Sequence, residues 1–334
     1  MTKIPVMLVA ALLSWGTAQS IAAQSVAHPE IGSFGFDING MDRAIAPGSD
    51  FYRYANGTWA RSTPIPADKS NFGMFTRLDD LNRERVKGIL DAAREDAHSK
   101  AGATYAAFLD EAAIESKGLK PALPWLDRIE GVATRADYAR LVAQAAREGV
   151  AIPFDVVVTQ DDRDPDTYVL KLGQAGLGLP DRDYYLRSDA TMVKTRSAYR
   201  DHVARLLVLA GTPKEEASRR ADALLRMETD IAKVSWNRVD SRDAGKTYNR
   251  RTRTQLASLA AGFGMDVFLD GIGAQPGELV VTQPSAVGSI ARVLGATPLP
   301  VLKDALRVAV LDAYGDVLPR AFAQERFDFH GRLL

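Results

Sequence analysis

Residues 212–234 read TPKEEASRRADALLRMETDIAKV, and this stretch sets the expected fold class. Thr212 is a suitable N-cap, and Pro213 takes the first helical position, where its missing N–H costs no hydrogen bond. Apolar residues then recur mostly at steps of three and four, which aligns them along one face of a helix. These residues are Ala217, Ala221, Leu224, Leu225, Ile231 and Val234. The stretch therefore predicts a long amphipathic helix.

Glu228 lies on the apolar face of this predicted helix, beside Leu224 and Ile231. A buried carboxylate without a partner is costly, or it becomes neutral. We expect Arg242 to be the partner of Glu228, which makes the pair architectural. A catalytic acid is the alternative interpretation, although no second catalytic group lies near Glu228 in the sequence.

Similar helical patterns, separated by proline and glycine, cover most of the remaining chain. The expected helices lie at about 48–60, 79–97, 101–115, 119–130, 135–148, 190–210, 213–236, 253–261, 284–294 and 298–323. Residues 154–159 and 168–172 differ, because they are short, rich in β-branched residues and flank a polar turn. Such a pair predicts a β-hairpin. The expected fold is therefore mainly α and multi-helical, with a small β-hairpin.

The composition excludes several classes of function. The chain has 334 residues with 42 Lys+Arg and 42 Asp+Glu, so its formal net charge is zero. This balance argues against a nucleic-acid partner recognised through a basic surface. The absence of cysteine excludes disulfides, thiolate metal sites and cysteine nucleophiles.

The four histidines are far apart in the sequence: His28, His98, His202 and His330. A zinc-binding helix needs two histidines four residues apart, since only this spacing points both rings the same way. No such pair exists here. A site assembled from distant ligands is the alternative. We interpret His98 and His202 as surface residues of helices.

The first residues have the features of a secretory signal peptide. Lys3 precedes an apolar run over residues 4–13, and small residues including Ala22 and Ala23 follow. The run is shorter than the ~20 residues that span a bilayer. We expect a signal peptide over 1–23, a flexible lead-in over 24–40 and no stable membrane span after cleavage, with an uncleaved anchor as the alternative. The protein is then exported, to a periplasm or the cell exterior.

Three blocks of sequence carry a resemblance to a known family. The first block contains MD at 41–42, PGSDFYRYANGTW at 47–59 and IPADKS at 65–70. The second is QAGLGLPDRDYY at 174–185, and the third contains MET at 227–229, RD at 242–243 and YN at 248–249. In this order and spacing the blocks resemble the neprilysin and endothelin-converting-enzyme family of zinc metallopeptidases. The resemblance implies a helical N-terminal (lid) domain over residues 41–334.

The resemblance also shows which family features this sequence does not contain. In the family, a C-terminal catalytic region carries His-Glu-x-x-His and a further glutamate ligand for zinc. Residues 327–334 resemble the approach to that region. The complete enzyme is thus expected to use Zn²⁺, whereas this chain alone supplies no catalytic residue or metal ligand. We expect it to be inactive and to hold no zinc, with the catalytic region and peptide substrates as its partners.

The expected function is that of the N-terminal region of an exported neprilysin-like zinc metalloendopeptidase. The alternative is a non-catalytic peptide-binding or scaffold protein (a pseudoenzyme) with the same helical fold. Neprilysin has two arginines, eight residues apart, in the loop that matches residues 64–81. Asn71 and Asp79 stand at these positions as candidate substrate-binding residues. Neither forms the bidentate pair that arginine makes with a peptide carboxylate, so we expect no strong preference for releasing C-terminal dipeptides. Asp79 as a helix cap is the alternative role.

Overall fold

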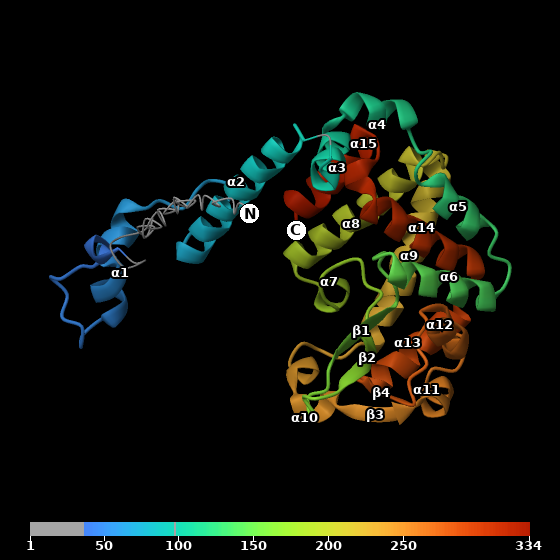
Figure 1. Cartoon of the computed structure of the whole chain (residues 1–334). Helices are drawn as coiled ribbons and strands as arrows, with labels where there is room; N and C mark the ends of the chain where they lie inside the picture. The colour runs from blue at the N-terminus through green and yellow to red at the C-terminus, as the bar shows by residue number, and fades with distance from the viewer. Residues whose placement is uncertain (1–36, 97) are drawn as a thin grey trace, which may run out of the picture. The chain divides into compact units, whose positions relative to one another are not determined.

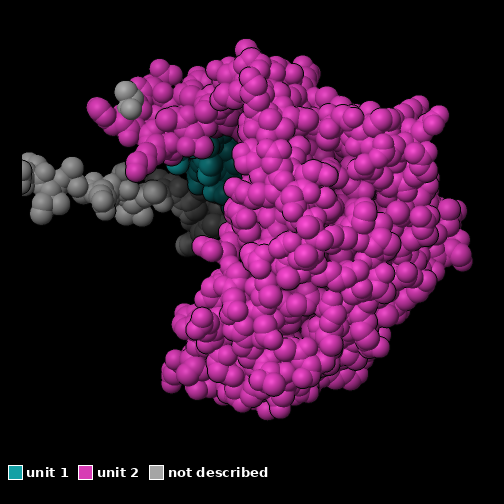
Figure 2. All heavy atoms as spheres, turned by 90° about the vertical axis from the view of Figure 1, so that its right-hand side faces the viewer, with its two compact units in different colours: residues 1–91 teal, residues 92–334 magenta. Residues whose placement is uncertain are grey.

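The computed structural model describes residues 37–96 and 98–334. The signal peptide expected over 1–23, and most of the lead-in expected over 24–40, lie outside these described residues. The chain divides into two compact units, unit 1 (residues 1–91) and unit 2 (residues 92–334), which Figure 2 colours separately. Helices predominate in the described parts of both units, as the sequence predicts (Figure 1).

Unit 1 contains a turn of 3₁₀-helix, Ile38–Gly40, followed by α1 (Phe51–Ser62) and most of α2 (Met74–Ala93). The side chain of Asp50 accepts a hydrogen bond from the backbone N–H of Arg53 and so caps the start of α1. Trp59 stacks on Phe72, with ring centroids 6.4 Å apart. No residue of α2 is buried.

Three short helices of unit 2, at 183–186, 244–247 and 265–271, were not expected from the sequence, and two expected helices are each divided in two. The helices of unit 2 otherwise fall in the expected places. They are α3 (Lys100–Leu109), α4 (Glu111–Lys117), α5 (Leu123–Glu130), α6 (Arg135–Arg147), α7 (Asp183–Leu186), α8 (Ala190–Leu209), α9 (Lys214–Val234), α10 (Ala244–Thr247), α11 (Arg253–Leu259), α12 (Met265–Gly271), α13 (Pro284–Ala296), α14 (Leu299–Ala313) and α15 (Arg320–Arg326). The single helix expected over 101–115 is wrong, because Asp110 ends α3 and caps α4. The helix expected over 298–323 is likewise wrong as one helix, because α14 ends at Ala313 and α15 begins only at Arg320, after Pro319.

Unit 2 also contains a small mixed sheet (Figure 1). The expected hairpin is confirmed, since β1 (Phe154–Gln160) pairs antiparallel with β2 (Tyr168–Gln174). The sequence did not indicate the other two strands, β3 (Asn249–Thr252) and β4 (Glu278–Val281). β4 pairs parallel with β2 and antiparallel with β3, which gives the order β1-β2-β4-β3.

Two apolar clusters form the core of unit 2, and α9 contributes to both. The first cluster packs the sheet against α5, α6 and α12 to α14, and Phe154 meets Phe263 edge to face at 4.9 Å within it. The second cluster joins α8, α9 and α15. Within α9, Leu224 and Ile231 are fully buried, so the amphipathic face predicted from the sequence is confirmed.

Among the described residues, no single helix combines the length and apolar composition needed to cross a membrane. Within the described part of the chain, one pair of helices, α13 and α14, meets that criterion together by length and composition, and the two are bent by 115° at the break between them.

Candidate functional site

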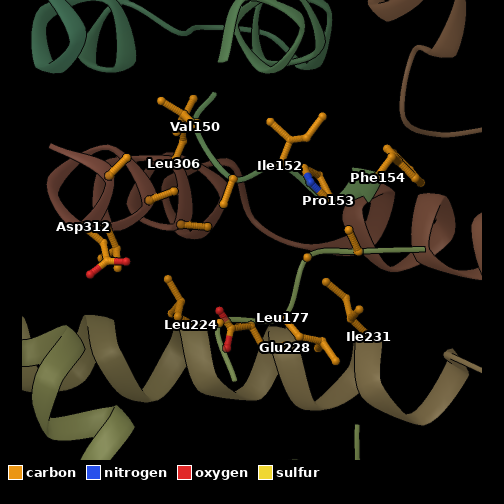
Figure 3. A pocket seen from close by; sticks show the side chains of 18 of the residues that line it. Val150, Ile152, Pro153, Phe154, Leu177, Leu224, Glu228, Ile231, Leu306 and Asp312 are labelled. Carbon is orange, nitrogen blue, oxygen red and sulfur yellow. The ribbon is translucent and has the colours of Figure 1, made fainter. Parts of the chain in front are cut away.

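A cavity of about 610 Å³ lies within unit 2. The segment 149–156, the loop 175–178 and helices α8, α9 and α14 supply most of its walls. Figure 3 shows apolar side chains such as Leu224 and Ile231 from α9 around this space, with the carboxylate of Glu228 among them. The acidic and basic lining residues are Asp155, His202, Glu228, Asp312 and His330. An apolar cavity with a few converging polar groups is typical of a ligand-binding site.

Glu228 is held by two tyrosines. The hydroxyl of Tyr185 donates to Oε2 of Glu228 at 2.6 Å, and the hydroxyl of Tyr199 donates to Oε1 at 2.8 Å. The expected partner Arg242 is therefore wrong. Two neutral tyrosine hydroxyls take the place expected for the arginine. Tyr185 in the second sequence block and Tyr199 in α8 both reach the buried face of α9.

Burial determines the protonation of Glu228. It raises the pKa of Glu228 to about 7, although the hydrogen bonds from Tyr185 and Tyr199 act in the opposite direction. Burial likewise raises the pKa values of Tyr185 and Tyr199 well above their ordinary value, so both hydroxyls keep their protons and remain hydrogen-bond donors. Glu228 therefore titrates near neutral pH, while each of its oxygens accepts one hydrogen bond from a tyrosine.

The charged residues of the second sequence block have structural partners. Asp181 pairs with Arg238 at 2.7 Å, and the guanidinium of Arg182 donates to the backbone carbonyl of Ser235 at the end of α9. The backbone N–H of Leu179 donates to the hydroxyl of Tyr185 at 2.9 Å. These contacts fasten the block to α9 and account for its residues without a substrate role.

A second group of polar side chains lies at another part of the cavity wall. His202 from α8 is 2% exposed, and its Nε2 lies 3.6 Å from Oδ1 of Asp312 at the end of α14. Nε2 of His330, from a turn of π-helix at Phe327–Gly331, lies 3.0 Å from the same oxygen. Burial alone would raise the pKa of Asp312, but the nearby imidazoles of His202 and His330 outweigh burial and hold this pKa well below its ordinary value.

The surface position expected for His202 is wrong, because its ring packs against Phe329 with centroids 4.5 Å apart. Charged neighbours in the sequence suggested exposure, but the ring is buried, and the neighbour Arg205 binds the same carboxylate as His202, that of Glu325. His98 is exposed as expected, although it lies in a turn before α3 and outside any helix. The separation of His202 from Asp312 and His330 in the sequence left no local signal for this cluster.

The two candidate substrate-binding residues lie in unit 1. Asn71 is exposed in the loop before α2. Asp79 is exposed within α2, where its carboxylate pairs with Arg83 at 2.9 Å. The alternative role of Asp79 as a helix cap is wrong, because α2 begins five residues earlier, at Met74.

The sequence contains no His-Glu-x-x-His segment, so its residues do not fit the zinc site that the family resemblance implies. Three described side chains nevertheless present one ligand atom each within 4.8 Å of one another, those of His202, Asp312 and His330.

Comparison with known proteins shows one family throughout. A family model described as peptidase family M13 matches residues 47–334. An endothelin-converting enzyme homolog of Locusta migratoria is 33% identical over 222 residues, covering 63% of this chain and 30% of that protein. Human endothelin-converting enzyme-like 1 is 30% identical over 298 residues, covering 81% of this chain and 38% of that protein.

Solved structures agree with these matches. The Mycobacterium tuberculosis zinc metalloprotease Zmp1 in complex with an inhibitor is 31% identical, with a TM-score of 0.80. The similarity covers 90% of this chain and 47% of the protease. The chain thus spans about a third of these curated relatives and about half of the solved protease.

Proposed function

The chain belongs to peptidase family M13, and from this membership we propose that it is the helical N-terminal part of an exported zinc metalloendopeptidase acting on peptides. The observation that carries the proposal is the family match over residues 47–334. In the complete enzyme, zinc would polarise the peptide carbonyl and supply an activated water. No residue of this chain takes part in that step.

The proposed contribution of this chain is to shape access to the peptide-binding cleft of the complete enzyme. The Tyr185–Glu228–Tyr199 group supports this role, because it fastens the second sequence block and α8 to the buried face of α9. A wall fixed in this way keeps its shape while peptides enter and leave. Peptide substrates and the catalytic region are accordingly its proposed partners.

The proposal requires that the chain alone does not hydrolyse peptides. Purified protein, incubated with zinc and a fluorogenic peptide, should show no turnover that a chelator abolishes. Chelator-sensitive turnover by a pure sample would contradict this part of the proposal. Reading the coding DNA beyond the codon for Leu334 provides a second test. A His-Glu-x-x-His segment there supports a metallopeptidase, and its absence favours a non-catalytic peptide-binding or scaffold protein that uses the cavity of unit 2.

Export is the remaining part of the proposal. The basic residue, apolar run and small residues over 1–23 support it. Expression of the full chain in a bacterium should give a processed protein in the periplasm, with a new N-terminus at residue 23 or 24. A protein that keeps Met1 and stays in the cytoplasm would contradict export without affecting the family assignment.

We also propose that Asn71 and Asp79 face the far end of a bound peptide in the complete enzyme. The motivation is the resemblance of their loop to the arginine-bearing loop of neprilysin. Asp79 carries a negative charge partly balanced by Arg83, so this position does not attract a free carboxylate. The enzyme should then cleave internal bonds without requiring a nearby C-terminus.

A further inference from the structure

The cluster at the end of α14 contains two hydrogen-bond acceptors that face each other. Nδ1 of His202 lies 2.9 Å from Oε1 of Glu325, and a carboxylate only accepts hydrogen bonds, so the proton belongs on Nδ1. In the neutral ring Nε2 is then an acceptor, and it faces Oδ1 of Asp312 at 3.6 Å. Two acceptors that face each other repel, so either a metal ion or a second proton on the ring has to lie between them.

We propose that His202, Asp312 and His330 form a binding site for a divalent transition metal of the zinc class. The ligands are Nε2 of His202, one carboxylate oxygen of Asp312 and Nε2 of His330. Their atoms already lie within 4.8 Å of one another, and both nitrogens approach the same oxygen. Tetrahedral coordination at about 2.0–2.2 Å would require only small side-chain shifts.

The surroundings of His202 orient its ring for this role. Glu325 fixes one ring nitrogen and leaves the other directed at Asp312. Glu325 is itself held by Nε of Arg205 at 2.6 Å, and Phe329 stacks on the imidazole at 4.5 Å. A carboxylate behind a histidine is the arrangement that sets the tautomer and raises the basicity of metal-binding imidazoles.

The ligand types select the metal. Two imidazoles and one carboxylate suit zinc, and also cobalt or nickel, whereas calcium and magnesium prefer sites composed of oxygen ligands. Three protein ligands leave a fourth position for water on the cavity side. The site would tie α8, α14 and the turn of π-helix at Phe327–Gly331 together.

One neighbouring charge competes for the same oxygen. Nε of Arg326 lies 3.8 Å from Oδ1 of Asp312, and this nitrogen has no hydrogen-bond partner among the described residues. Nη1 of the same guanidinium pairs with Asp316 at 2.6 Å. A proton on Nε2 of His202 together with Arg326 is therefore the alternative to a metal, and metal content decides between them.

The test uses the chain purified without a histidine tag. It is equilibrated with zinc chloride, passed through metal-free buffer, and assayed for zinc by mass spectrometry, with binding titrated in parallel. The wild-type chain should retain about one zinc per molecule. Glu325→Gln should keep that stoichiometry and bind about 10–100-fold more weakly, as is typical when an outer partner of a metal-bound histidine is changed. His330→Ala removes a ligand and should bind more weakly still.

His98→Ala is the matched control, because it removes an exposed histidine outside the cluster. It should bind zinc as the wild type does. The proposal is overturned if the wild-type chain retains no zinc, or if all four proteins bind it equally. The visible absorption spectrum of the wild-type chain loaded with cobalt gives a readout that needs no variant. Tetrahedral coordination of cobalt produces intense visible bands, and their absence would also overturn the proposal. Zinc retained without peptide hydrolysis would leave the proposed function intact and would correct the expectation that this chain holds no metal.

Discussion

Tyr199 occupies the space that a side chain at position 178 would need. A Cβ atom added to Gly178 would lie 1.9 Å from the hydroxyl oxygen of Tyr199. That hydroxyl donates to Glu228, so the glycine in the second sequence block allows the buried hydrogen bond to form.

Gly178→Ala should therefore destabilise the protein by ~1–3 kcal/mol, the usual cost of forcing extra volume into a packed core. The rigid ring of Tyr199 has to move, and its bond to Glu228 lengthens. Urea unfolding followed by circular dichroism measures the change. Gly277→Ala is the control, because that position has open space around it, and it should change stability by less than about 0.5 kcal/mol. Equal effects of the two substitutions would contradict the close approach.

Glu228→Gln should change how stability depends on pH. The pKa of Glu228 rises from its ordinary 4.5 to about 7 in the folded protein, so the folded chain binds more protons than the unfolded chain in this interval. The free energy of unfolding therefore falls as the pH rises from about 4.5 to 7. At ~1.4 kcal/mol per pH unit the loss is about 3 kcal/mol, and the glutamine variant lacks it.

Urea unfolding at several pH values between 4 and 8 measures this effect as the difference between wild type and variant, in which the other titrating groups cancel. The advantage of the wild type should shrink toward high pH. Glu111→Gln, which changes an exposed carboxylate of α4, is the control. A difference between wild type and Glu228→Gln that stays constant with pH would contradict a buried carboxyl with a raised pKa.

The exposed apolar face of α2 predicts binding of a hydrophobic dye. Phe75, Leu78, Val86 and Ile89 are all exposed, and their spacing places them on one side of the helix. Contiguous apolar surface of this kind usually marks a missing partner. The wild-type chain should enhance the fluorescence of such a dye, and the double variant Phe75→Ser with Ile89→Ser should lose much of the signal.

Val239→Ser is the control for the dye experiment, because Val239 is 81% exposed but belongs to unit 2. It should leave the signal nearly unchanged. A monodisperse wild-type chain that gives no dye signal would argue for a finished protein with no further region to bind.

Asn71→Arg tests the loop before α2, in the enzyme restored with its catalytic region. The unmodified enzyme should cleave peptides with free and amidated C-termini at similar kcat/KM. An added arginine should favour the free carboxylate on the order of tenfold, the value expected for one hydrogen bond between charged groups. Asn71→Gln keeps the position neutral and is the control. A strong preference for free carboxylates in the unmodified enzyme would refute the proposed role of Asn71 and Asp79.

The helical fold was predictable because its signals are local. The apolar steps that predict α9 all lie within the helix, and the turn that joins β1 to β2 lies directly between them in the sequence. The expected N-cap is wrong, because Pro213 rather than Thr212 takes the N-cap position and no side chain caps the start of α9. β3 is different, since Asn249–Thr252 is short and polar and becomes a strand only through pairing with β4. Such tertiary pairing leaves no periodic pattern in the sequence.

The candidate site was less predictable for the same reason. The position of Glu228 on the apolar face was correct, but its tyrosine partners lie 29 and 43 residues away, and a nearer arginine seemed the natural choice. His202 looked exposed because its sequence neighbours are charged. Its burial depends on Phe329 and Glu325, which join α8 only after the chain has folded back.

The parallel pairing of β2 with β4 has a consequence for folding during synthesis. β2 lies between β1 and β4, and Gln174 and Gln283, which meet beside this pairing, are 109 positions apart. The β1–β2 hairpin can form as soon as it leaves the ribosome, but one edge of β2 stays open until β4 has been made. An open strand edge is a template for pairing with other chains. A nascent chain is therefore most prone to aggregation in this interval, and slowing translation between residues 174 and 278 should lower the yield of folded protein more than slowing it after residue 284.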